Sequence, residues 1–307
     1  MTHHPDVAVI GEIYVDHVFS GFPTWPQPGE EIVTDSYVRE MGGGAAATAC
    51  GLAKLGRSVA LVGLVGADDM PWFRERLARF GVASDGLSIG DGATGTSISV
   101  STAQDRSFFT HIGVNRQVGV LAVGKGLKTL KNARHVHFAM PLPRDVADIV
   151  LPELTAAGIT TSLDMGYQPV WLADPANGPT LTAIDHLIPN EKEAELICGS
   201  ADPAAYLDHA ALIGLRHPMV KLGARGAAAL EHGIIVQAAP PAVVAVDATG
   251  AGDAFDAGFI DALLDGGDAL ARLRRGCLTG ALSTRQPGAL AAIPDTQELR
   301  SFYDRTY

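Results

Sequence analysis

The chain has 307 residues, of which 47% are hydrophobic and only 19% are charged. This balance is enough to bury a large core and argues against disorder. Lysine and arginine number 23 against 34 aspartate and glutamate residues, so the formal net charge is 23 − 34 = −11. A nucleic-acid-binding surface normally needs a basic excess, and we therefore expect no nucleic acid as partner.

The sequence also gives no indication of a membrane or a secretory route. The apolar stretch at residues 59–62 is far shorter than the roughly 20 residues that a membrane span needs. The first six residues lack the basic and apolar regions of a secretory signal. Cys50, Cys198 and Cys277 are widely spaced and fit neither a disulfide framework nor a zinc pattern. We expect a cytoplasmic protein with no membrane partner.

Short β-branched runs alternate with longer helical segments along most of the chain. The helices are expected at residues 45–55, 72–80, 145–157 and 191–198. The strands are expected at residues 7–11, 59–63, 135–139, 160–164, 186–189 and 219–222. This alternation predicts a mostly parallel central sheet covered by helices on both faces, which is a three-layer α/β/α sandwich.

Two segments break this alternation. Residues 16–39 are rich in proline and have no helical period. Residues 96–112 alternate between apolar and polar side chains, as in a half-exposed antiparallel pair of strands. We interpret both segments as one small β subdomain that projects from the α/β body.

The segment with the clearest chemistry is 243–259. The valine-rich residues 243–246 predict a strand, which a turn of small residues joins to a helix that begins near Asp253. The backbone N–H groups of Gly250, Ala251 and Gly252 would then form an anion hole for a transferring phosphoryl group. The Asp253 carboxylate is placed to remove a proton from a hydroxyl nucleophile. The alternative is a tight turn with Asp253 as an ordinary helix cap.

Residues 247–255 read D-A-T-G-A-G-D-A-F and resemble the C-terminal signature D-T-T-G-A-G-D-x-F of the ribokinase-like (PfkB) carbohydrate kinases. Other motifs of this family are matched, in the expected order, at 41–56, 65–69, 189–194 and 220–226. The resemblance covers nearly the whole chain. It implies an ATP-dependent kinase that phosphorylates a hydroxyl of a sugar or sugar derivative. It also implies a core at 1–12, 41–94 and 118–307 and a β-sheet lid at 13–40 and 95–117.

The resemblance further implies a role for each matching residue. Asp253 matches the general base, with Gly250, Ala251 and Gly252 as the anion hole. Asp16, Gly42 and Gly43, together with Asp253, match positions that bind the acceptor. The positions assigned to the nucleotide are Asn190, Lys221, Gly223, Gly226, Thr249, Gly250, Gly252 and Gly288. Glu193 matches a residue that organises Mg²⁺ through water, and Asp247 and Thr249 match positions that hold a monovalent cation. ATP and Mg²⁺ are thus implied, with K⁺ as a further candidate.

Several positions depart from the family pattern. Ala47 replaces an asparagine that contacts sugar hydroxyls, and Tyr14 stands where ribokinases proper have asparagine, which argues against ribose itself. Glu30 stands where sulfofructose kinases have a lysine, which disfavours a sulfonated sugar. Lys221 replaces a hydroxyl residue and would bring a positive charge near the nucleotide phosphates.

Two other functions remain open. A nucleoside or hydroxymethyl-pyrimidine kinase would use the same scaffold, and a non-catalytic sugar-binding protein would use the fold without the chemistry. The surroundings of Ala47 and Tyr14 separate the acceptors, because aromatic stacking there would favour a base and polar groups a sugar. A nicotinamide dehydrogenase is a more distant alternative.

Three arginines, Arg106, Arg116 and Arg144, are candidates for binding a phosphate or carboxylate of the substrate, although each alone is more often a solvated charge. His135 and His137 share one strand face, but no third ligand has fitting spacing, and we interpret them as structural. The exposed edges of the lid strands predict a homodimer through lid-to-lid pairing.

Overall fold

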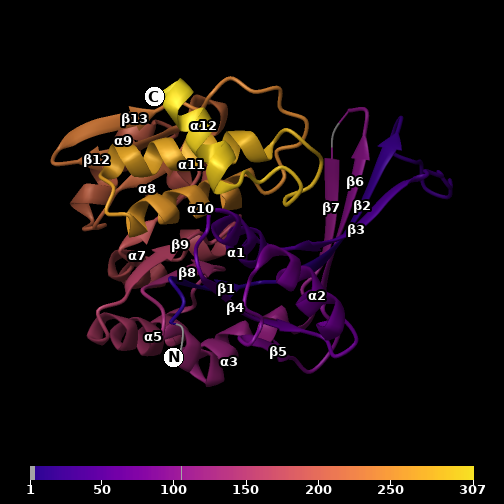
Figure 1. Ribbon diagram of the computed structural model, residues 1–307, viewed down its shortest axis with the longest axis horizontal. Helices are drawn as coiled ribbons and strands as arrows, with labels where there is room; N and C mark the ends of the chain where they lie inside the picture. Colours follow the sequence, from indigo (N-terminus) through magenta and orange to yellow (C-terminus); the bar gives the residue numbers. More distant parts are fainter. Residues whose placement is uncertain (1–3, 105) are drawn as a thin grey trace.

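The computed structural model describes residues 4–104 and 106–307. A six-stranded sheet in the order β10-β9-β8-β1-β4-β5 lies at the centre of the molecule, and its strand pairs all run parallel (Figure 1). Its strands are β1 (Val7–Gly11), β4 (Val59–Val65), β5 (Leu87–Ile89), β8 (His135–Ala139), β9 (Thr160–Leu163) and β10 (His186–Leu187). Helices cover both faces, and the predicted three-layer α/β/α sandwich is confirmed.

The side chains of β1 alternate between two hydrophobic cores, which explains why this strand is apolar throughout. Val7 and Val9 belong to the core under α1 (Gly44–Lys54), α2 (Met70–Phe80), α10 (Ala251–Leu264) and α11 (Ala269–Ser283). Ala8 and Ile10 belong to the opposite core, under α3 (Val118–Val123), α4 (Lys125–Leu130), α5 (Arg144–Ala156), α6 (Pro169–Ala173), α7 (Gly178–Ala183), α8 (Glu191–Cys198) and α9 (Pro203–Leu212). The C-terminal helix α12 (Thr296–Thr306) packs on a small separate cluster. No helix in the described ranges is both long and apolar enough to span a bilayer.

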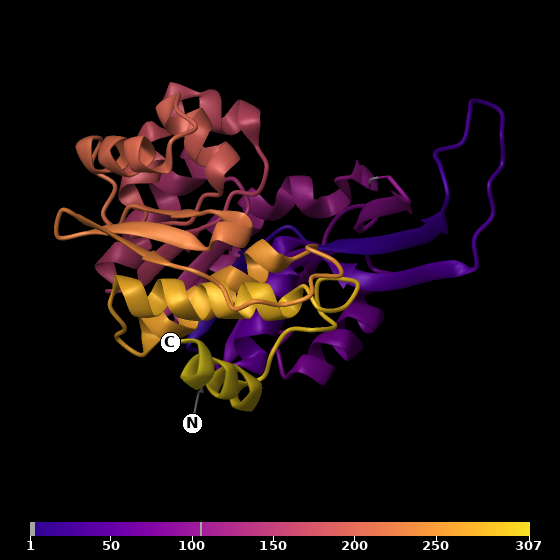
Figure 2. The same cartoon turned by 90° about the horizontal axis from the view of Figure 1, so that it is seen from above.

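The predicted small sheet is also present. It has the order β3-β2-β6-β7 and projects from one side of the body (Figure 1). Its strands are β2 (Tyr14–Phe22), β3 (Ser36–Gly42), β6 (Gly95–Thr102) and β7 (Arg106–His111). The loop between β2 and β3 reaches further from the body than the strands themselves (Figure 2). We call this sheet and its loop the lid. β3 continues to Gly42, two residues past the end of the lid segment predicted at 13–40. The exact lid boundaries stay a prediction.

Two predicted strands differ from the structure. The strand expected at 219–222 is β11 (Met219–Lys221), but it lies in a separate antiparallel sheet with β12 (Ala227–Glu231) and β13 (Ile234–Ala238). The strand expected at 243–246 was wrong: this segment is irregular, and Val244 and Val246 are 85% and 60% exposed. Valine favours a strand only where a neighbouring strand pairs with it, and none does so here within the described residues.

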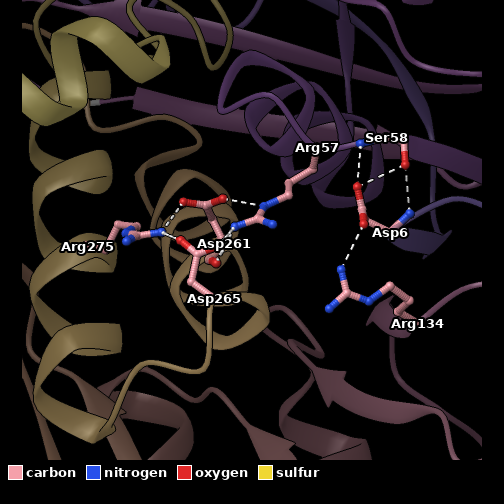
Figure 3. Close-up of polar contacts among 7 residues, drawn as sticks. All are labelled: Asp6, Arg57, Ser58, Arg134, Asp261, Asp265 and Arg275. Carbon is pink, nitrogen blue, oxygen red and sulfur yellow. Dashed lines mark hydrogen bonds and ion pairs between the residues drawn. The ribbon is translucent and has the colours of Figure 1, made fainter.

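Polar contacts fix the amino ends of three central strands. The Asp6 carboxylate accepts hydrogen bonds from the N–H and the hydroxyl of Ser58, each at 3.0 Å, and pairs with Arg134 at 3.0 Å (Figure 3). These residues precede β1, β4 and β8, so the contacts hold the strand register at the end of the sheet away from the loops that follow the strands.

A second network joins α1 to α10 and α11. Arg57, shortly after α1, and Arg275 of α11 each lie 2.5 Å from the Asp261 carboxylate of α10 (Figure 3). Asp265, the residue directly after α10, pairs with both arginines at 2.5 and 2.6 Å. The network holds α10 between its neighbours, and α10 is the helix that carries Asp253.

Candidate active site

Two cavities lie on either side of the turn that begins α10, at the carboxyl ends of the central strands, where parallel sheets commonly bind ligands. The lid-side cavity, of about 310 Å³, is lined by Tyr14, Asp16, Gly43, Gly44, Ala47, Ser97, Thr110, Thr249, Gly250, Asp253 and Ala289. The body-side cavity, of about 540 Å³, is lined by Lys221, Gly223, Gly226 and Gly252 and by further, mostly apolar residues between positions 224 and 284. Residues 248–253 contribute to both cavities.

The glycine run at 42–44 makes room for the two carboxylates of the lid-side cavity. A Cβ atom on Gly42 would lie 2.1 Å from the carboxylate of Asp16, and one on Gly44 would lie 2.8 Å from Oδ1 of Asp253. Gly43 has a φ of +90°, which a side chain would strain. Because these glycines have no side chains, the carboxylates of Asp16 and Asp253 can occupy the space beside them.

The turn before α10 presents backbone N–H groups to the site. Gly250 is the N-terminal cap with a φ of +73°. The N–H of Ala251 donates to the carbonyl oxygen of Ala248 at 3.2 Å, whereas those of Gly250 and Gly252 have no hydrogen-bond partner in the described part of the chain. The three amides of the predicted anion hole are therefore not equivalent. Two of them are available to an anion at the positive end of this 14-residue helix.

The two carboxylates of the lid-side cavity both titrate above their ordinary range. Burial raises the pKa of Asp253 to about 7, and the negative charge of Asp164 adds to the shift. Burial also raises the pKa of Asp16 to about 6, with a further contribution from Glu40. A carboxylate with a pKa near neutrality suits general-base chemistry.

A buried charge cluster lies beneath Asp253. The Lys221 ammonium contacts Oδ2 of Asp164 at 2.6 Å and Oδ1 of Asp256 at 3.2 Å. Carboxylate oxygens of Asp164, Asp253 and Asp256 lie within 4.8 Å of one another. Burial alone would lower the pKa of Lys221, but Asp164 and Asp256 outweigh it and raise the pKa, so this ammonium stays charged. Lys221 also lies 3.5 Å from the point where a Cβ on Gly252 would be.

Sequence reasoning missed Asp164 and Asp256. Asp164 is the last residue of the strand expected at 160–164 and directly follows the observed β9, at the end where parallel sheets gather their functional side chains. Asp256 lies three residues after Asp253 and so on the same helix face. Both signals were present in the sequence, but only the fold shows that the two carboxylates share Lys221.

The predicted nucleotide residues fall into separate groups. Gly223 and Gly226 line the body-side cavity, and a Cβ on Gly226 would lie 1.9 Å from the carbonyl oxygen of Ala238. Thr249 and Gly250 instead line the lid-side cavity. Gly288 is not among the lining residues of either cavity.

Asp247 ties two loops together next to the turn. Its carboxylate accepts hydrogen bonds from the N–H of Gly288 at 2.8 Å and from the N–H and hydroxyl of Thr249 at 2.9 and 2.7 Å. Gly288 therefore supports the turn through Asp247. The monovalent-cation role of Asp247 and Thr249 stays a prediction.

Asn190 and Glu193 form the N-terminal capping box of α8. The Asn190 side chain accepts from the N–H of Glu193 at 3.1 Å, and the Glu193 carboxylate accepts from the N–H and the side chain of Asn190 at 2.8 and 2.7 Å. Asn190 also bridges to the backbone of Lys221. Burial and the charge of Asp164 raise the pKa of Glu193 to about 7.

The donor set around Lys221 fits a magnesium ion that arrives with a phosphate ligand. Mg²⁺ prefers oxygen ligands and is commonly held by one or two carboxylates plus substrate phosphates. Asp164 and Asp256 supply carboxylates here, and the buried Asp256 has one carboxylate oxygen, Oδ2, without a hydrogen-bond partner in the described residues. The resemblance had pointed to Asn190 and Glu193 for this role, with Glu193 acting through water, and these two residues are bonded to each other in the capping box.

Two of the four residues that depart from the family pattern meet in the lid-side cavity. Ala47 and Tyr14 both line it, and the Tyr14 hydroxyl donates to Oε2 of Glu12 at 2.6 Å. Sequence reasoning missed Asn115. Its side-chain oxygen accepts a hydrogen bond from the N–H of Ile13 at 3.1 Å, and its side-chain nitrogen donates to the carbonyl oxygen of Ile13 at 2.8 Å. Asn115 thereby fixes the chain where it passes from β1 into the lid, and no local pattern marks that role.

The remaining candidates lie away from the cavities. Arg116 and Arg144 are exposed and line neither cavity, and the side chain of Arg106 is outside the described part of the structure. His135 and His137 are buried, and both accept or donate a hydrogen bond at 2.8 Å with the hydroxyl of Ser162. Burial lowers their pKa values to about 3 and about 4, so both rings are neutral structural groups.

This fold, with a carboxylate and unpartnered amides at a helix N-terminus between two cavities, is typical of a phosphotransferase with a hydroxyl acceptor. The chain belongs to the pfkB family of carbohydrate kinases, whose model matches residues 4–296. It is 27% identical to the ribokinase of Haemophilus influenzae, over 97% of this chain and 98% of that protein. It is 32% identical to the ATP-dependent ribose-1-phosphate kinase of Halopiger xanaduensis, over 88% of each chain. The structure of Arabidopsis thaliana ribokinase with ribose and ATP superposes with a TM-score of 0.84 at 24% identity, covering 98% of this chain and 99% of that one.

Proposed function

We propose that this protein transfers the γ-phosphoryl group of MgATP to a hydroxyl of a sugar or sugar derivative. The observation that carries the proposal is the position of Asp253, which lines the lid-side cavity beside the unpartnered amides of Gly250 and Gly252. The ATP dependence printed for the Halopiger xanaduensis relative supports ATP as the phosphoryl donor.

In this proposal each cavity holds one substrate. The nucleotide lies in the body-side cavity along Gly223 and Gly226, with the Lys221 ammonium toward its phosphates. Asn190 and Glu193 would hold Mg²⁺ and its waters, and the bound ion would neutralise phosphate charge. The acceptor lies in the lid-side cavity, where the carboxylate of Asp16 accepts hydrogen bonds from its hydroxyls.

The chain's own groups then carry the transfer. Asp253 accepts the proton of the acceptor hydroxyl as that oxygen attacks the γ-phosphorus, and the bond from this phosphorus to the β,γ-bridging oxygen breaks to release ADP. The amides of Gly250 and Gly252 donate hydrogen bonds to the oxygens of the transferring group. The lid covers the acceptor and excludes water that would otherwise take the phosphoryl group.

The lining of the lid-side cavity favours a sugar over a nucleobase. Asp16, Ser97 and Thr110 offer polar groups to hydroxyls, and the one aromatic ring among the described lining residues is Tyr14. Tyr14 and Ala47 are therefore surrounded by polar side chains rather than by rings for stacking. A nucleoside kinase is the second candidate, because the Tyr14 ring in the cavity wall offers a surface on which a base stacks.

The decisive experiment is ADP release from MgATP across a panel of sugars, sugar derivatives and nucleosides, with and without K⁺. We expect turnover with a sugar, and a loss of about 10³-fold or more in kcat for Asp253→Asn with ATP affinity unchanged. Asp208→Asn, at an exposed aspartate of α9, is the matched control. Wild-type protein that binds a sugar but releases no ADP would favour the non-catalytic alternative. Full activity of Asp253→Asn would show that the base is another residue.

We also infer a homodimer through the lid. Phe19, Tyr37, Ile98 and Phe109 are adjacent on one face of the lid sheet, and Trp25 stacks on Phe109 with ring centroids 6.0 Å apart. Tyr37 and Phe109 are 47% and 55% exposed, and an exposed aromatic face of this kind is typical of a protein interface. Light scattering should give twice the 32.0 kDa chain mass. A monomer at micromolar concentration would contradict this inference.

A further inference from the structure

We propose that the Lys221 ammonium occupies the cation position between Asp164 and Asp256 until a nucleotide binds, and thereby excludes divalent metal ions from the nucleotide-free protein. This inference rests on the proposed function and specifies how the metal ion of that site is admitted. Lys221 stands where the family pattern has a hydroxyl residue, so the arrangement is a feature of this chain rather than of the family.

Three carboxylates converge beneath the turn that begins α10. Oxygens of Asp164, Asp253 and Asp256 lie within 4.8 Å of one another, so two or three of them can contact one ion. The Asp256 side chain is fully buried, and its Oδ2 has no hydrogen-bond partner among the described residues. Nε2 of His137 lies 3.9 Å from this oxygen, which is beyond hydrogen-bonding distance. A buried carboxylate oxygen without a donor indicates a position for a cation.

The Lys221 ammonium already lies where a bridging ion would bind. Its Nζ is 2.6 Å from Oδ2 of Asp164 and 3.2 Å from Oδ1 of Asp256. A magnesium ion on the same two oxygens would lie about 2.0–2.1 Å from each, so it would take the place of the ammonium. A dication elsewhere among these carboxylates would lie close to the ammonium, and like charges repel strongly in a buried site. Lys221 therefore opposes metal binding in the nucleotide-free protein.

Glu193 does not relieve this competition. Its two carboxylate oxygens accept hydrogen bonds from the N–H and the side chain of Asn190 at 2.8 and 2.7 Å. Because these bonds close the capping box of α8, they favour contact between Glu193 and a metal ion through water. Direct contact is left to Asp164, Asp253 and Asp256, and Lys221 is bonded to two of these three.

A nucleotide supplies the groups that would move the ammonium. Lys221 lines the body-side cavity, and its Nζ lies 3.5 Å from the point where a Cβ on Gly252 would be. An ammonium has three N–H donors, and that of Lys221 has two acceptors in the described part of the chain, which leaves one donor for a phosphate oxygen. Phosphates that draw the ammonium toward the turn free the carboxylates for the ion that accompanies them. Metal and nucleotide therefore bind together, and metal alone does not bind.

The first test measures Mn²⁺ binding by electron paramagnetic resonance, in the absence of nucleotide and sugar. Lys221→Met should bind the ion at least about tenfold more tightly than wild type, because the repelling charge is gone. Lys128→Met, at an exposed lysine of α4, is the matched control and should bind Mn²⁺ as the wild type does. Equal affinities in wild type and Lys221→Met would overturn the proposal.

A double variant locates the ion. Lys221→Met combined with Asp256→Asn removes one of the carboxylates together with the lysine, so the added Mn²⁺ affinity should be lost. If the double variant keeps that affinity, the ion binds elsewhere on this acidic chain and the proposal is wrong. Mn²⁺ should also raise the thermal midpoint of Lys221→Met by several degrees and leave that of the wild type unchanged, because only the variant binds the ion without nucleotide.

A second measurement uses the wild type, so that the test does not depend on the folding of Lys221→Met. In a crystal structure with Mg²⁺ and a non-hydrolysable ATP analogue, Nζ of Lys221 should contact a phosphate oxygen, and the metal ion should contact Asp164 or Asp256. An ammonium that still bridges both carboxylates, with the ion bound elsewhere, would overturn the proposal.

These measurements separate the inference from the proposed function, because none of them needs turnover. Metal entry that depends on the nucleotide, in a protein that phosphorylates no acceptor, would retain the role of Lys221 and reject the kinase reaction. Turnover of a sugar by a wild-type protein that binds Mn²⁺ alone as tightly as Lys221→Met does would reject the role of Lys221 and retain the kinase reaction.

Discussion

Gly42 leaves free the space that the Asp16 carboxylate occupies. The importance of this space can be tested by adding a single methyl group at position 42. In Gly42→Ala the new Cβ would lie 2.1 Å from the Asp16 carboxylate, whereas ordinary contacts are 3.4–4 Å. The carboxylate must therefore move by more than about 1 Å, because the backbone of Gly42 is paired with Tyr14 in the lid sheet and the side chain of Asp16 is the softer partner.

The size of the effect follows from what Asp16 is proposed to do. A hydrogen bond to a charged group contributes about 1.5–3 kcal/mol, which corresponds to roughly 10- to 150-fold. We expect the KM for the acceptor to rise by that factor in Gly42→Ala, while the KM for ATP stays within about twofold because the body-side cavity does not include this residue.

The assay measures both KM values and the thermal midpoint. Gly178→Ala is the matched control, since its Cβ would meet nothing within 4 Å and its φ of −50° suits alanine. An unchanged acceptor KM in a folded Gly42→Ala protein would refute the role of Asp16. A rise in the ATP KM of equal size would show that the change spreads beyond the lid-side cavity.

Three further results are expected. The kcat/KM for the acceptor should rise with pH and level off above a midpoint near 7, because Asp253, with its pKa of about 7, accepts a proton only when ionised; a flat profile from about pH 5.5 to 9 would contradict this. Lys221→Met should lower the free energy of unfolding in urea by about 3–5 kcal/mol, since it leaves buried carboxylates unpaired, whereas the exposed Lys128→Met should have no such effect. Asp261→Asn should lower the free energy of unfolding by about 1–3 kcal/mol, because two arginines contact this buried carboxylate. Asp148→Asn, in an exposed ion pair, should lower the free energy of unfolding by less than about 0.5 kcal/mol. Equal losses in the two variants would argue against the network.

The central sheet could be predicted from the sequence because its strands are short, apolar and separated by helices. Val7–Gly11 and Val59–Val65 are apolar on both faces, which only a buried parallel strand requires. The same rule failed at residues 243–246, because a valine run does not show whether another strand lies beside it. It also placed residues 219–222 in the wrong sheet, since composition does not encode strand order.

The site was predictable where the chain itself brings residues together. Gly250, Gly252 and Asp253 are consecutive or nearly so, and their arrangement follows from one turn and one helix start. The Asp164–Lys221–Asp256 cluster was not predictable, because its members come from the loop after β9, from β11 and from α10 and meet only after folding.

The two cavities draw their walls from different parts of the chain. Most residues of the lid-side wall precede position 111, all of the body-side wall follows position 220, and the turn at 248–253 is shared. Under the proposed function, a crossover between relatives anywhere in 112–163 would replace most of the acceptor's wall and keep the donor's wall together with Asp164. Acceptor choice in such a gene can therefore diverge by recombination while the machinery for the phosphoryl donor is inherited intact.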